Sequence, residues 1–320
     1  MKWHLKKQPY IVFILDVFLN SIYGQIQNGE DYYIVTPDLG APSLDDLRIY
    51  YPDRFISVGI AEQSLIAISA GLTMAGHKVI AYGLNPFPVT RAFDQLKSVI
   101  AGMDIPLTIC GLNAGLCSAE AGYTHIPTED FGMLRMLPNI EVYNPTDCTI
   151  AGLLADSTAS IKHPRYIRFD KKLGEKIYEI AEIELGKGFA VYGCEEAEIT
   201  VVTLGNYVAD MRKLADEFGN RIKVIDVFKM KPDIPALVDV LGNSKTIVTL
   251  EENMLEGGLG SFILEVLSDS KLSIPTHRLG VRFMPYRVFA NRDYIQKDQN
   301  LDIQSVRQFL LKLTEAGAFK

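Results

Sequence analysis

The chain has 320 residues, a length above that at which one hydrophobic core usually keeps growing, so two domains are expected. Hydrophobic residues make up 48% of it, but no apolar run is both long enough and uncharged enough to span a bilayer. A formal net charge of −7 without any basic run argues against a nucleic-acid partner or an anionic-membrane surface. The basic start "MKWHLKKQ" precedes an apolar stretch, but Asp16 interrupts that stretch and no small-x-small cleavage site follows, which favours a cytoplasmic protein.

The predicted elements alternate between short β-branched runs and longer helical segments, which is typical of βαβ units and a parallel sheet. In the first half we predict strands at 32–36, 54–58, 78–82, 107–111, 140–144 and 165–169. Helices are predicted between them, at 11–27, 62–76, 89–102, 129–136 and 147–160. Asp147 is the predicted N-cap of the last of these helices.

The alternation pauses over residues 171–197, which are charged, punctuated by glycine and weakly periodic, as expected for a crossover linker. A second alternation follows, with strands at 199–205, 222–227, 245–250 and 275–280 and helices at 206–218, 234–241, 258–268 and 303–315. The predicted fold class is therefore α/β, with two domains that each contain a mostly parallel sheet flanked by helices. We place the first domain at 1–180, a linker at 181–197 and the second domain at 198–320.

Common motifs for catalysis and nucleotide binding are missing from the sequence. There is no "GxGxxG" after a strand, no "GxxxxGK[ST]" and no "GxSxG". The stretch "EGGLGSF" (256–262) could hold an anion on its amides, but tight packing of a helix start is the favoured interpretation. The five histidines form no HxH or HxxxH pair, and the four cysteines fit no trusted metal or redox spacing, so no metal site is predicted and the thiols are taken as structural.

Glu62, in "GIAEQ", lies where a predicted strand end meets a predicted helix start. Carboxylates are stabilised in the first turn of a helix by its dipole and free N–H groups, which gives Glu62 a simple capping interpretation. Alternatively, a carboxyl group among apolar residues such as Ile60, Leu65 and Ile66 is poised to share a proton. The residues alone leave both interpretations open.

A second candidate region is the long segment 110–130, "CGLNAGLCSAEAGYTHIPTED", which follows a predicted strand and contains His125. Open α/β sheets place ligands at the carboxyl ends of their strands, so this segment is a candidate ligand-binding loop. For a histidine alone in a loop, a structural role is the more ordinary interpretation.

Three motifs lie in order along the chain: "VGIAEQ", "GYTHIPTEDFGMLRMLPNIEVYNPTD" (122–147) and "EENMLEGGLG" (251–260). Together they resemble the C-terminal half of transketolase-like thiamine diphosphate enzymes, from about Ile34 to Leu313. The resemblance implies a pyrimidine-binding domain followed by a transketolase C-terminal-like domain, in agreement with the two domains expected from periodicity. It also implies thiamine diphosphate as the cofactor.

In that family, the glutamate at the position of Glu62 hydrogen-bonds a ring nitrogen of the cofactor's aminopyrimidine. A carboxyl group shared with that nitrogen favours the imino tautomer, which can take the proton from the thiazolium carbon. The resemblance therefore favours the catalytic interpretation of Glu62 over the capping one.

The segment "AYGLNPFPVTRAFDQL" (81–96) resembles the family segment whose aromatic side chains stack on the aminopyrimidine. Phe87 falls on one stacking position, while Leu84 and Thr90 occupy positions where other members carry aromatic residues. Asp38 completes the residues expected at the cofactor. Within the segment 81–96, the sequence "RAFDQ" is closer to the form found in 1-deoxyxylulose-5-phosphate synthases and two-subunit transketolases.

His125 matches a family histidine that hydrogen-bonds the substrate's carbonyl-derived oxygen and helps proton transfer. Asn113 occupies the position of a second substrate-facing histidine, and Ala121 replaces an acidic residue that contacts a sugar hydroxyl. Where an arginine usually receives the sugar phosphate, this chain has Lys171, a point charge without the bidentate fork. Arg168 and Lys172 are near it in the sequence, and Arg168 is expected to contact the substrate phosphate together with Lys171. These departures favour a specialised ketose or 2-oxoacid over the pentose phosphates of central metabolism.

The family normally holds the diphosphate and its divalent metal, Mg²⁺ or Ca²⁺, on a separate domain that carries a "GDG" motif. No "GDG" occurs in this sequence. We therefore expect the small subunit of a split enzyme, with an α partner that carries the diphosphate domain. The small subunit is expected to self-associate, and a heterotetramer is the smallest complete form.

The leading hypothesis is a transketolase-like enzyme that moves a two-carbon ketol unit between sugars or sugar phosphates. One alternative is a β subunit of a 2-oxoacid dehydrogenase or a component of a deoxyxylulose-phosphate-type synthase. Another is a non-catalytic scaffold or regulatory subunit. The presence of both Glu62 and His125 argues against the scaffold.

Overall fold

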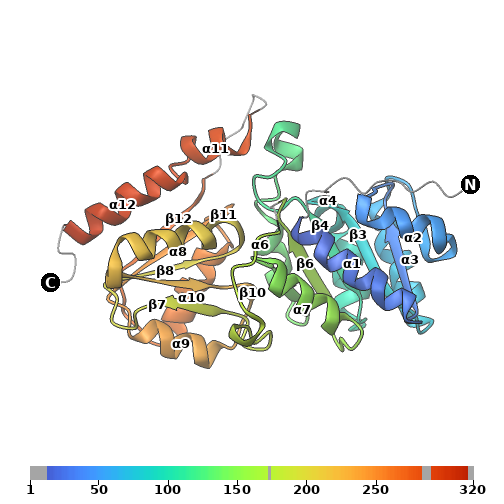
Figure 1. Ribbon diagram of the computed structural model, residues 1–320, viewed down its shortest axis with the longest axis horizontal. Coiled ribbons are helices and arrows are strands. Elements are labelled where there is room, and N and C mark those ends of the chain that lie inside the picture. The colour runs from blue at the N-terminus through green and yellow to red at the C-terminus, as the bar shows by residue number, and fades with distance from the viewer. Residues whose placement is uncertain (1–12, 172–173, 283–289, 316–320) are drawn as a thin grey trace, which may run out of the picture.

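The computed structural model describes residues 13–171, 174–282 and 290–315. In this part of the chain the strands form a seven-stranded and a five-stranded sheet, each mostly parallel and flanked by helices (Figure 1). The prediction of two α/β domains is thus confirmed. Lys172 lies outside the described residues.

The first sheet has the strand order β10-β5-β6-β4-β3-β1-β2. Its strands from the first half are β1 (Tyr32–Thr36), β2 (Phe55–Ser57), β3 (Lys78–Leu84), β4 (Thr108–Leu112), β5 (Glu141–Tyr143) and β6 (Arg165–Phe169). The helices of this half are α1 (Ile14–Gln27), α2 (Asp45–Tyr50), α3 (Glu62–Met74), α4 (Phe87–Thr90), α5 (Phe93–Gln95), α6 (Asp130–Arg135) and α7 (Cys148–Thr158). As predicted, Asp147 caps α7, because its side chain accepts a hydrogen bond from the Ile150 amide.

The second sheet has the strand order β12-β11-β8-β9-β7. The strands of this half of the chain are β7 (Ala190–Gly193), β8 (Ile199–Thr203), β9 (Ile222–Asp226), β10 (Lys229–Met230), β11 (Thr246–Met254) and β12 (Thr276–Val281). Its helices are α8 (Val208–Glu217), α9 (Ile234–Gly242), α10 (Leu259–Asp269), α11 (Arg292–Asp298) and α12 (Ile303–Glu315).

Two short strands pair in ways that the periodicity did not indicate. Strand β7 lies inside the predicted linker and pairs antiparallel with β9, so it is the edge strand of the second sheet. Strand β10 follows β9 in sequence but pairs antiparallel with β5, and so extends the first sheet. The second half of the chain therefore contributes a strand to the sheet of the first half.

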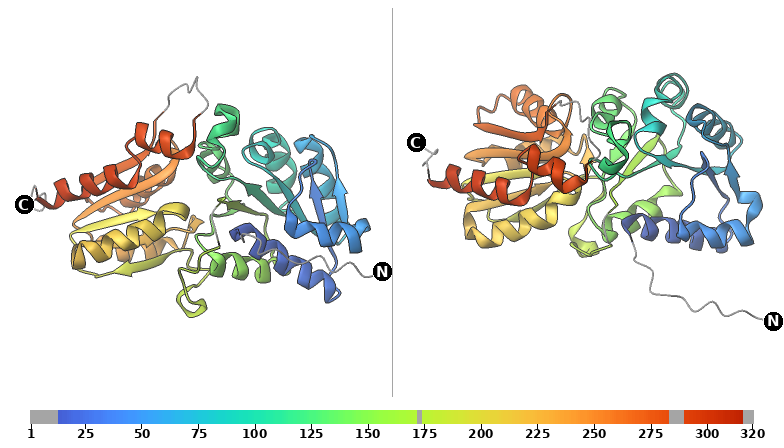
Figure 2. Two further views of the ribbon diagram at one scale, coloured as in Figure 1. Left: turned by 45° about the horizontal axis from the view of Figure 1, so that its top comes forward. Right: turned by 90° about the horizontal axis from the view of Figure 1, so that it is seen from above.

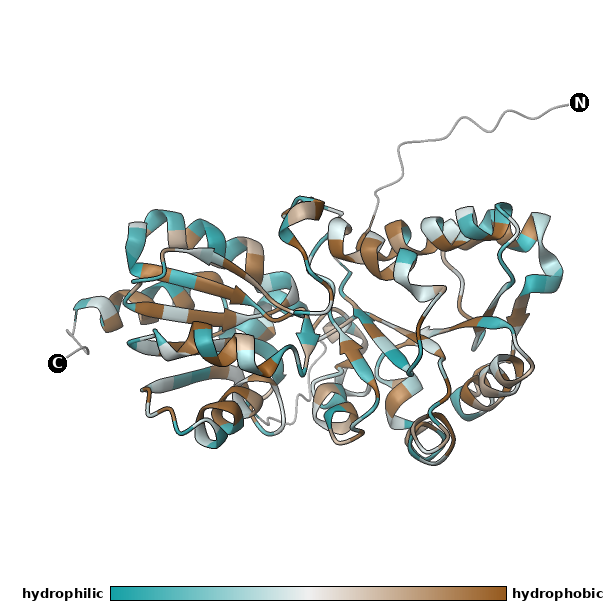
Figure 3. Ribbon diagram, turned by 90° about the horizontal axis from the view of Figure 1, so that it is seen from below, coloured by the Kyte–Doolittle hydropathy of each residue, from teal (hydrophilic) through white to brown (hydrophobic). Residues whose placement is uncertain are grey.

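Three apolar clusters hold these layers together. One lies between the first sheet and the pair α1 and α7, and a second lies between the second sheet and helices α8, α11 and α12. The third cluster contains residues of α3 and α6 as well as α9 and α10, so it continues from one domain into the other. Helix α12 runs along the outside of the second sheet (Figure 2). In the hydropathy colouring, apolar residues alternate with polar ones along the helices and are frequent in the strands of both sheets (Figure 3).

The predicted helix over 89–102 is present as three short pieces, α4, α5 and a π-helical turn over Leu96–Ala101. The Thr90 hydroxyl donates to the Pro86 carbonyl at 3.2 Å, and such side-chain bonding to the preceding turn bends helices. The break leaves Phe87 and Arg91 one turn apart, beside the carboxyl end of β3. Helices α2 and α11 were not predicted, since both are shorter than a clear periodic pattern requires.

Candidate active site

The carboxyl edge of the first sheet collects the residues that the sequence pointed to. Asp38 follows β1, Glu62 follows β2, Leu84 ends β3, Asn113 follows β4 and Lys171 follows β6. Parallel strands end at the same edge of a sheet, and ligands of open α/β sheets bind there.

Glu62 is the first residue of α3 and is only 5% exposed. Its helix neighbours Leu65 and Ile66 are fully buried, whereas Ile60 is 77% exposed and does not contribute to the apolar surroundings that were expected. Within the described residues no backbone amide of α3 donates to the Glu62 side chain, whose one hydrogen bond comes from Arg91. This carboxylate is therefore buried without the backbone partners that the capping interpretation requires.

Glu62, Arg91, Phe87 and His125 form a continuous row of contacts. Arg91 Nη1 donates to Glu62 Oε2 at 2.9 Å, and the Arg91 guanidinium carbon lies 3.9 Å from the centre of the Phe87 ring. The rings of Phe87 and His125 meet edge to face with their centres 5.0 Å apart. The structure thus brings both predicted catalytic residues to one ring, Phe87, with Arg91 between that ring and Glu62.

His125 is half-buried at the end of a 3₁₀ turn over Tyr123–His125. Its Nδ1 lies 2.9 Å from the Thr124 hydroxyl, while within the described residues no hydrogen bond involves Nε2. A histidine whose one nitrogen is fixed can exchange a proton or a hydrogen bond through the other. Asn113 is held separately, with its side-chain amide donating to the Ser118 hydroxyl at 2.8 Å.

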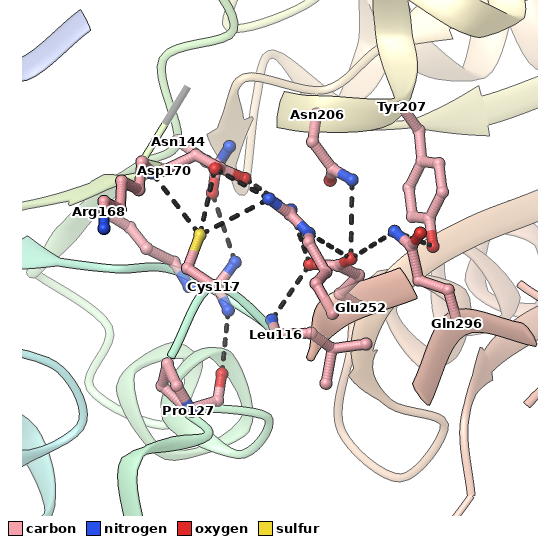
Figure 4. Close-up of polar contacts among 12 residues, drawn as sticks. Leu116, Cys117, Pro127, Asn144, Arg168, Asp170, Asn206, Tyr207, Glu252 and Gln296 are labelled. Atoms are coloured by element: carbon pink, nitrogen blue, oxygen red, sulfur yellow. Dashed lines mark hydrogen bonds and ion pairs between the residues drawn. The ribbon is translucent and has the colours of Figure 1, made fainter. Parts of the chain in front are cut away.

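Arg168 has a different environment from the one expected for a phosphate ligand. It is 3% exposed, and its Nε donates to Asp130 at 2.6 Å. Its two terminal nitrogens donate to Asn144 and to the carbonyl of Pro127, at 3.2 and 2.9 Å (Figure 4). Because each guanidinium nitrogen has a partner inside the chain, the geometry does not favour the predicted phosphate contact. Lys171, in contrast, is exposed.

A buried charge network joins the two domains next to Arg168. Arg292, on α11, donates to Asp170 at 2.7 and 3.0 Å and to Glu252, on β11, at 2.8 Å through two nitrogens. Gln296 and the Leu116 amide also donate to Glu252, and the Cys117 thiol donates to Asp170 (Figure 4). Burial alone would raise the pKa of Asp170, but the Arg292 charge holds it below its ordinary value. We call Asp170, Glu252 and Arg292 the junction network.

The glycine-rich stretch at 256–262 holds an internal carboxyl group, that of Glu251. The Leu259 and Gly260 amides, at the start of α10, donate to the two carboxylate oxygens of Glu251 at 2.6 and 2.7 Å. An added Cβ at Gly260 would lie 2.6 Å from the Thr249 hydroxyl, and one at Gly258 would clash with Glu251. The packing interpretation of this motif is confirmed. Burial raises the pKa of Glu251 to about 7 despite the two amide hydrogen bonds.

Across residues 13–171, 174–282 and 290–315, no cluster of three or more His, Cys, Asp or Glu side chains is arranged to hold a metal ion. In the same part of the chain, no helix combines the length and apolar character needed to cross a membrane.

Sequence reasoning missed the role of Arg91 and the whole junction network. Arg91 was visible only as part of "RAFDQ", although its spacing from Phe87, four residues apart, indicates neighbours on one helical turn. Arg292 gave no signal, since its partners Asp170 and Glu252 lie 122 and 40 residues away.

Comparison with known proteins decides the family of this fold. The transketolase pyrimidine-binding domain family matches residues 16–176, and the transketolase C-terminal domain family matches residues 188–304. The chain belongs to the transketolase family. Within this family it is homologous to the B subunits of split transketolases.

Three members of the transketolase family illustrate the range of similar proteins. The B subunit of the apulose-4-phosphate transketolase of Actinobacillus succinogenes is 27% identical, and the match covers 94% of this chain and 98% of that protein. The 1-deoxy-D-xylulose-5-phosphate synthase of Thermomicrobium roseum is 33% identical over 80% of this chain but only 41% of its own length. A solved split-gene transketolase, described as an inactive β4 tetramer, has a TM-score of 0.79 and 26% identity, covering 94% and 97% of the two chains.

A transketolase pyrimidine-binding domain implies thiamine diphosphate, and this chain's residues fit its aminopyrimidine end. Within the described residues the Glu62 carboxylate has a single hydrogen bond, from Arg91 to Oε2, so Oε1 has none. A buried acceptor with a free oxygen, next to the half-buried ring of Phe87, suits a flat heterocycle with N–H groups.

Proposed function

We propose that the chain is the pyrimidine-binding subunit of a two-subunit, thiamine diphosphate-dependent transferase that moves a two-carbon ketol unit between sugars or sugar phosphates. The observation that carries this proposal is the buried carboxylate of Glu62, which lacks backbone partners and lies in one row of contacts with Phe87 and His125. A structural carboxylate at a helix start would instead bind the free amides.

Three residues of the row, Glu62, Phe87 and His125, have separate roles in this proposal. Glu62 hydrogen-bonds a ring nitrogen of the aminopyrimidine and shares a proton with it, Phe87 stacks on that ring, and Leu84 and Asp38 complete its surroundings. His125 uses Nε2 to hydrogen-bond the substrate oxygen that derives from the carbonyl, and Asn113 contacts a neighbouring hydroxyl. The bound cofactor supplies the carbon nucleophile of the reaction.

A partner subunit is proposed to hold the diphosphate and its metal ion, Mg²⁺ or Ca²⁺. Support comes from relatives: the match covers 98% of a protein that is named as a B subunit and 97% of a split-gene transketolase chain. We propose a heterotetramer in which two copies of this chain associate with two partner chains. The inactive β4 form of the solved relative fits a small subunit that self-associates and lacks activity alone.

The substrate is proposed to be a specialised ketose phosphate, for which apulose 4-phosphate is the first candidate because two relatives are named for it. Lys171, exposed at the end of β6, is the proposed phosphate ligand. A second candidate function is a synthase of the deoxyxylulose-phosphate type, which is favoured by the 33% identity to the Thermomicrobium roseum synthase.

The decisive experiment is calorimetric titration of thiamine diphosphate and Mg²⁺ into the chain alone and into its mixture with a subunit that carries the diphosphate domain. We expect binding only in the mixture, and ketol transfer that Glu62→Ala abolishes. Turnover of a 2-oxoacid with an aldose phosphate, without ketol transfer, would favour the synthase. A stable complex that binds no cofactor would contradict both and leave a scaffold role.

A further inference from the structure

Arg91 is the one residue of the contact row whose role the proposed function leaves open. Its guanidinium donates to Glu62 Oε2 and lies over the face of Phe87, 3.9 Å from the ring centre. These two contacts use the same carboxylate and the same aromatic ring that the aminopyrimidine requires. The side chain is 48% exposed, so it is anchored at its tip to a 5% exposed partner while much of its remaining surface is open to solvent.

The guanidinium also has the chemical features of the ring that would displace it. Both groups are planar, both present N–H donors to a carboxylate, and both stack on an aromatic face. A guanidinium is always charged, so it also neutralises a carboxylate that is otherwise buried without a cation. Arg91 therefore stabilises the site in the form that contains no cofactor.

We propose that Arg91 is a placeholder: in the chain without cofactor its guanidinium occupies Glu62 and Phe87, and it swings out to solvent when the aminopyrimidine binds. This inference rests on the proposed function. The Arg91 contacts stabilise the chain without cofactor. They also lower the apparent cofactor affinity, because part of the binding free energy is needed to displace Arg91. The end of α4 permits the movement, since Arg91 follows the last helical residue, Thr90.

The test is the dissociation constant of thiamine diphosphate with Mg²⁺ in the reconstituted complex, measured by calorimetry for wild type, Arg91→Met and Arg91→Lys. Methionine keeps the unbranched stem and removes the charge and the planar donors. We expect Arg91→Met to bind the cofactor about tenfold more tightly. This factor corresponds to a wild-type site that Arg91 leaves open to cofactor in roughly one tenth of the molecules. Arg91→Lys, which keeps the charge but loses the planar stack, is expected between the two. Arg307→Met is the matched control. Arg307 lies on α12, is partly exposed like Arg91, and is paired with Glu217 at the end of α8.

Thermal melting separates a placeholder from a residue that positions Glu62 throughout the reaction. A placeholder predicts that Arg91→Met lowers the melting temperature of the chain alone, but leaves that of the cofactor-loaded complex unchanged. Equal or weaker cofactor binding by Arg91→Met, with the melting temperature lowered in both forms, would overturn the inference and assign Arg91 a positioning role.

The outcome also distinguishes the two proposals. Absence of cofactor binding by the wild-type complex would overturn the proposed function and the placeholder together. Binding by wild type that Arg91→Met fails to tighten would overturn the placeholder alone. If Arg91→Met does not fold, Arg91→Lys decides, because unchanged or weaker binding by that variant has the same meaning.

Discussion

The two domains each contain a buried glutamate beside the start of a helix, and the two glutamates have opposite environments. Glu251, in the second domain, has both carboxylate oxygens bonded to the first amides of α10. Glu62, in the first domain, begins α3 but bonds to none of its amides and has Arg91 as its partner. Both carboxyl groups are buried beside a helix start, although Glu251 lies on β11 and Glu62 on α3 itself, so burial does not distinguish a structural carboxylate from one available to a ligand. The partner atoms make that distinction.

The largest expected effect is the loss of turnover on substitution of Glu62. Glu62→Gln keeps the shape and removes the shared proton, so we expect turnover by the reconstituted complex to fall about a thousandfold. The urea midpoint of the chain alone should change little, because the glutamine oxygen can still accept the hydrogen bond from Arg91 and no backbone amide depends on this side chain. A variant with normal turnover would show that Glu62 is not a proton-sharing group, and would remove the main support for the proposed function.

Substitution of Glu251 should lower stability and leave cofactor binding unchanged, the reverse of the effect expected for Glu62. Glu251→Ala leaves the Leu259 and Gly260 amides without their acceptor in a buried site, and we expect the free energy of unfolding to fall by about 3 kcal/mol. Cofactor binding per folded molecule should be unchanged. Urea denaturation measures the first quantity and calorimetry the second. Loss of cofactor affinity at full stability would mean that the second domain contributes to the site directly.

The second domain contains another buried carboxyl group, Asp226, which makes stability depend on pH. Burial raises the pKa of Asp226 to about 7. In the unfolded chain this pKa is close to 4, so the folded chain retains a proton that the unfolded chain has lost. The stabilisation is fully present below about pH 4, is lost progressively as pH rises towards about 7, and is absent above that pH. We expect Asp226→Asn, which retains an oxygen for the Tyr178 hydroxyl, to be more stable than wild type at pH 8 by about 2 kcal/mol.

At pH 3, below the pKa of Asp226 in both states, the Asp226→Asn variant and wild type should have nearly equal free energies of unfolding, because this position is then neutral in the folded and the unfolded chain alike. Urea denaturation at the two pH values provides the comparison. A constant difference between the two proteins at both pH values would show that Asp226 is charged in the folded chain.

The smallest expected effect concerns two cations that lie close together in sequence, Arg168 and Lys171. Lys171→Ala should raise the KM for a phosphorylated substrate about tenfold without lowering stability, because the side chain is exposed. An unphosphorylated ketose is the control, and its KM should not change. Equal KM values for Lys171→Ala and wild type would remove Lys171 from the proposed phosphate site.

The sequence predicted most elements of the fold because buried parallel strands appear as continuous apolar runs. Strands β1 and β6 and helix α12 have the predicted bounds. Strand β10 could not be found in this way, since it has two residues and its partner β5 lies far away in sequence. No strand was predicted in the linker 181–197 for a similar reason, because β7 is an edge strand with little apolar patterning.

The candidate site shows the same limit. Glu62, Phe87 and His125 belong to local motifs, so a resemblance could identify them. Arg91 was in view, but its contact with Glu62 joins positions 29 residues apart, which no local pattern encodes. Arg168 was assigned to phosphate because it is a cation near a strand end, whereas its burial beside Asp130 depends on the fold.

The junction network also has a consequence for the order of folding. Arg292 contacts Cys117 and Asp170, at separations of 175 and 122 residues, and each contact requires a long loop to close. Contacts of such large separation form slowly, whereas the neighbouring βαβ units of each sheet close over short distances. We therefore expect the two sheets to form first and α11 to lock them together in a late kinetic step.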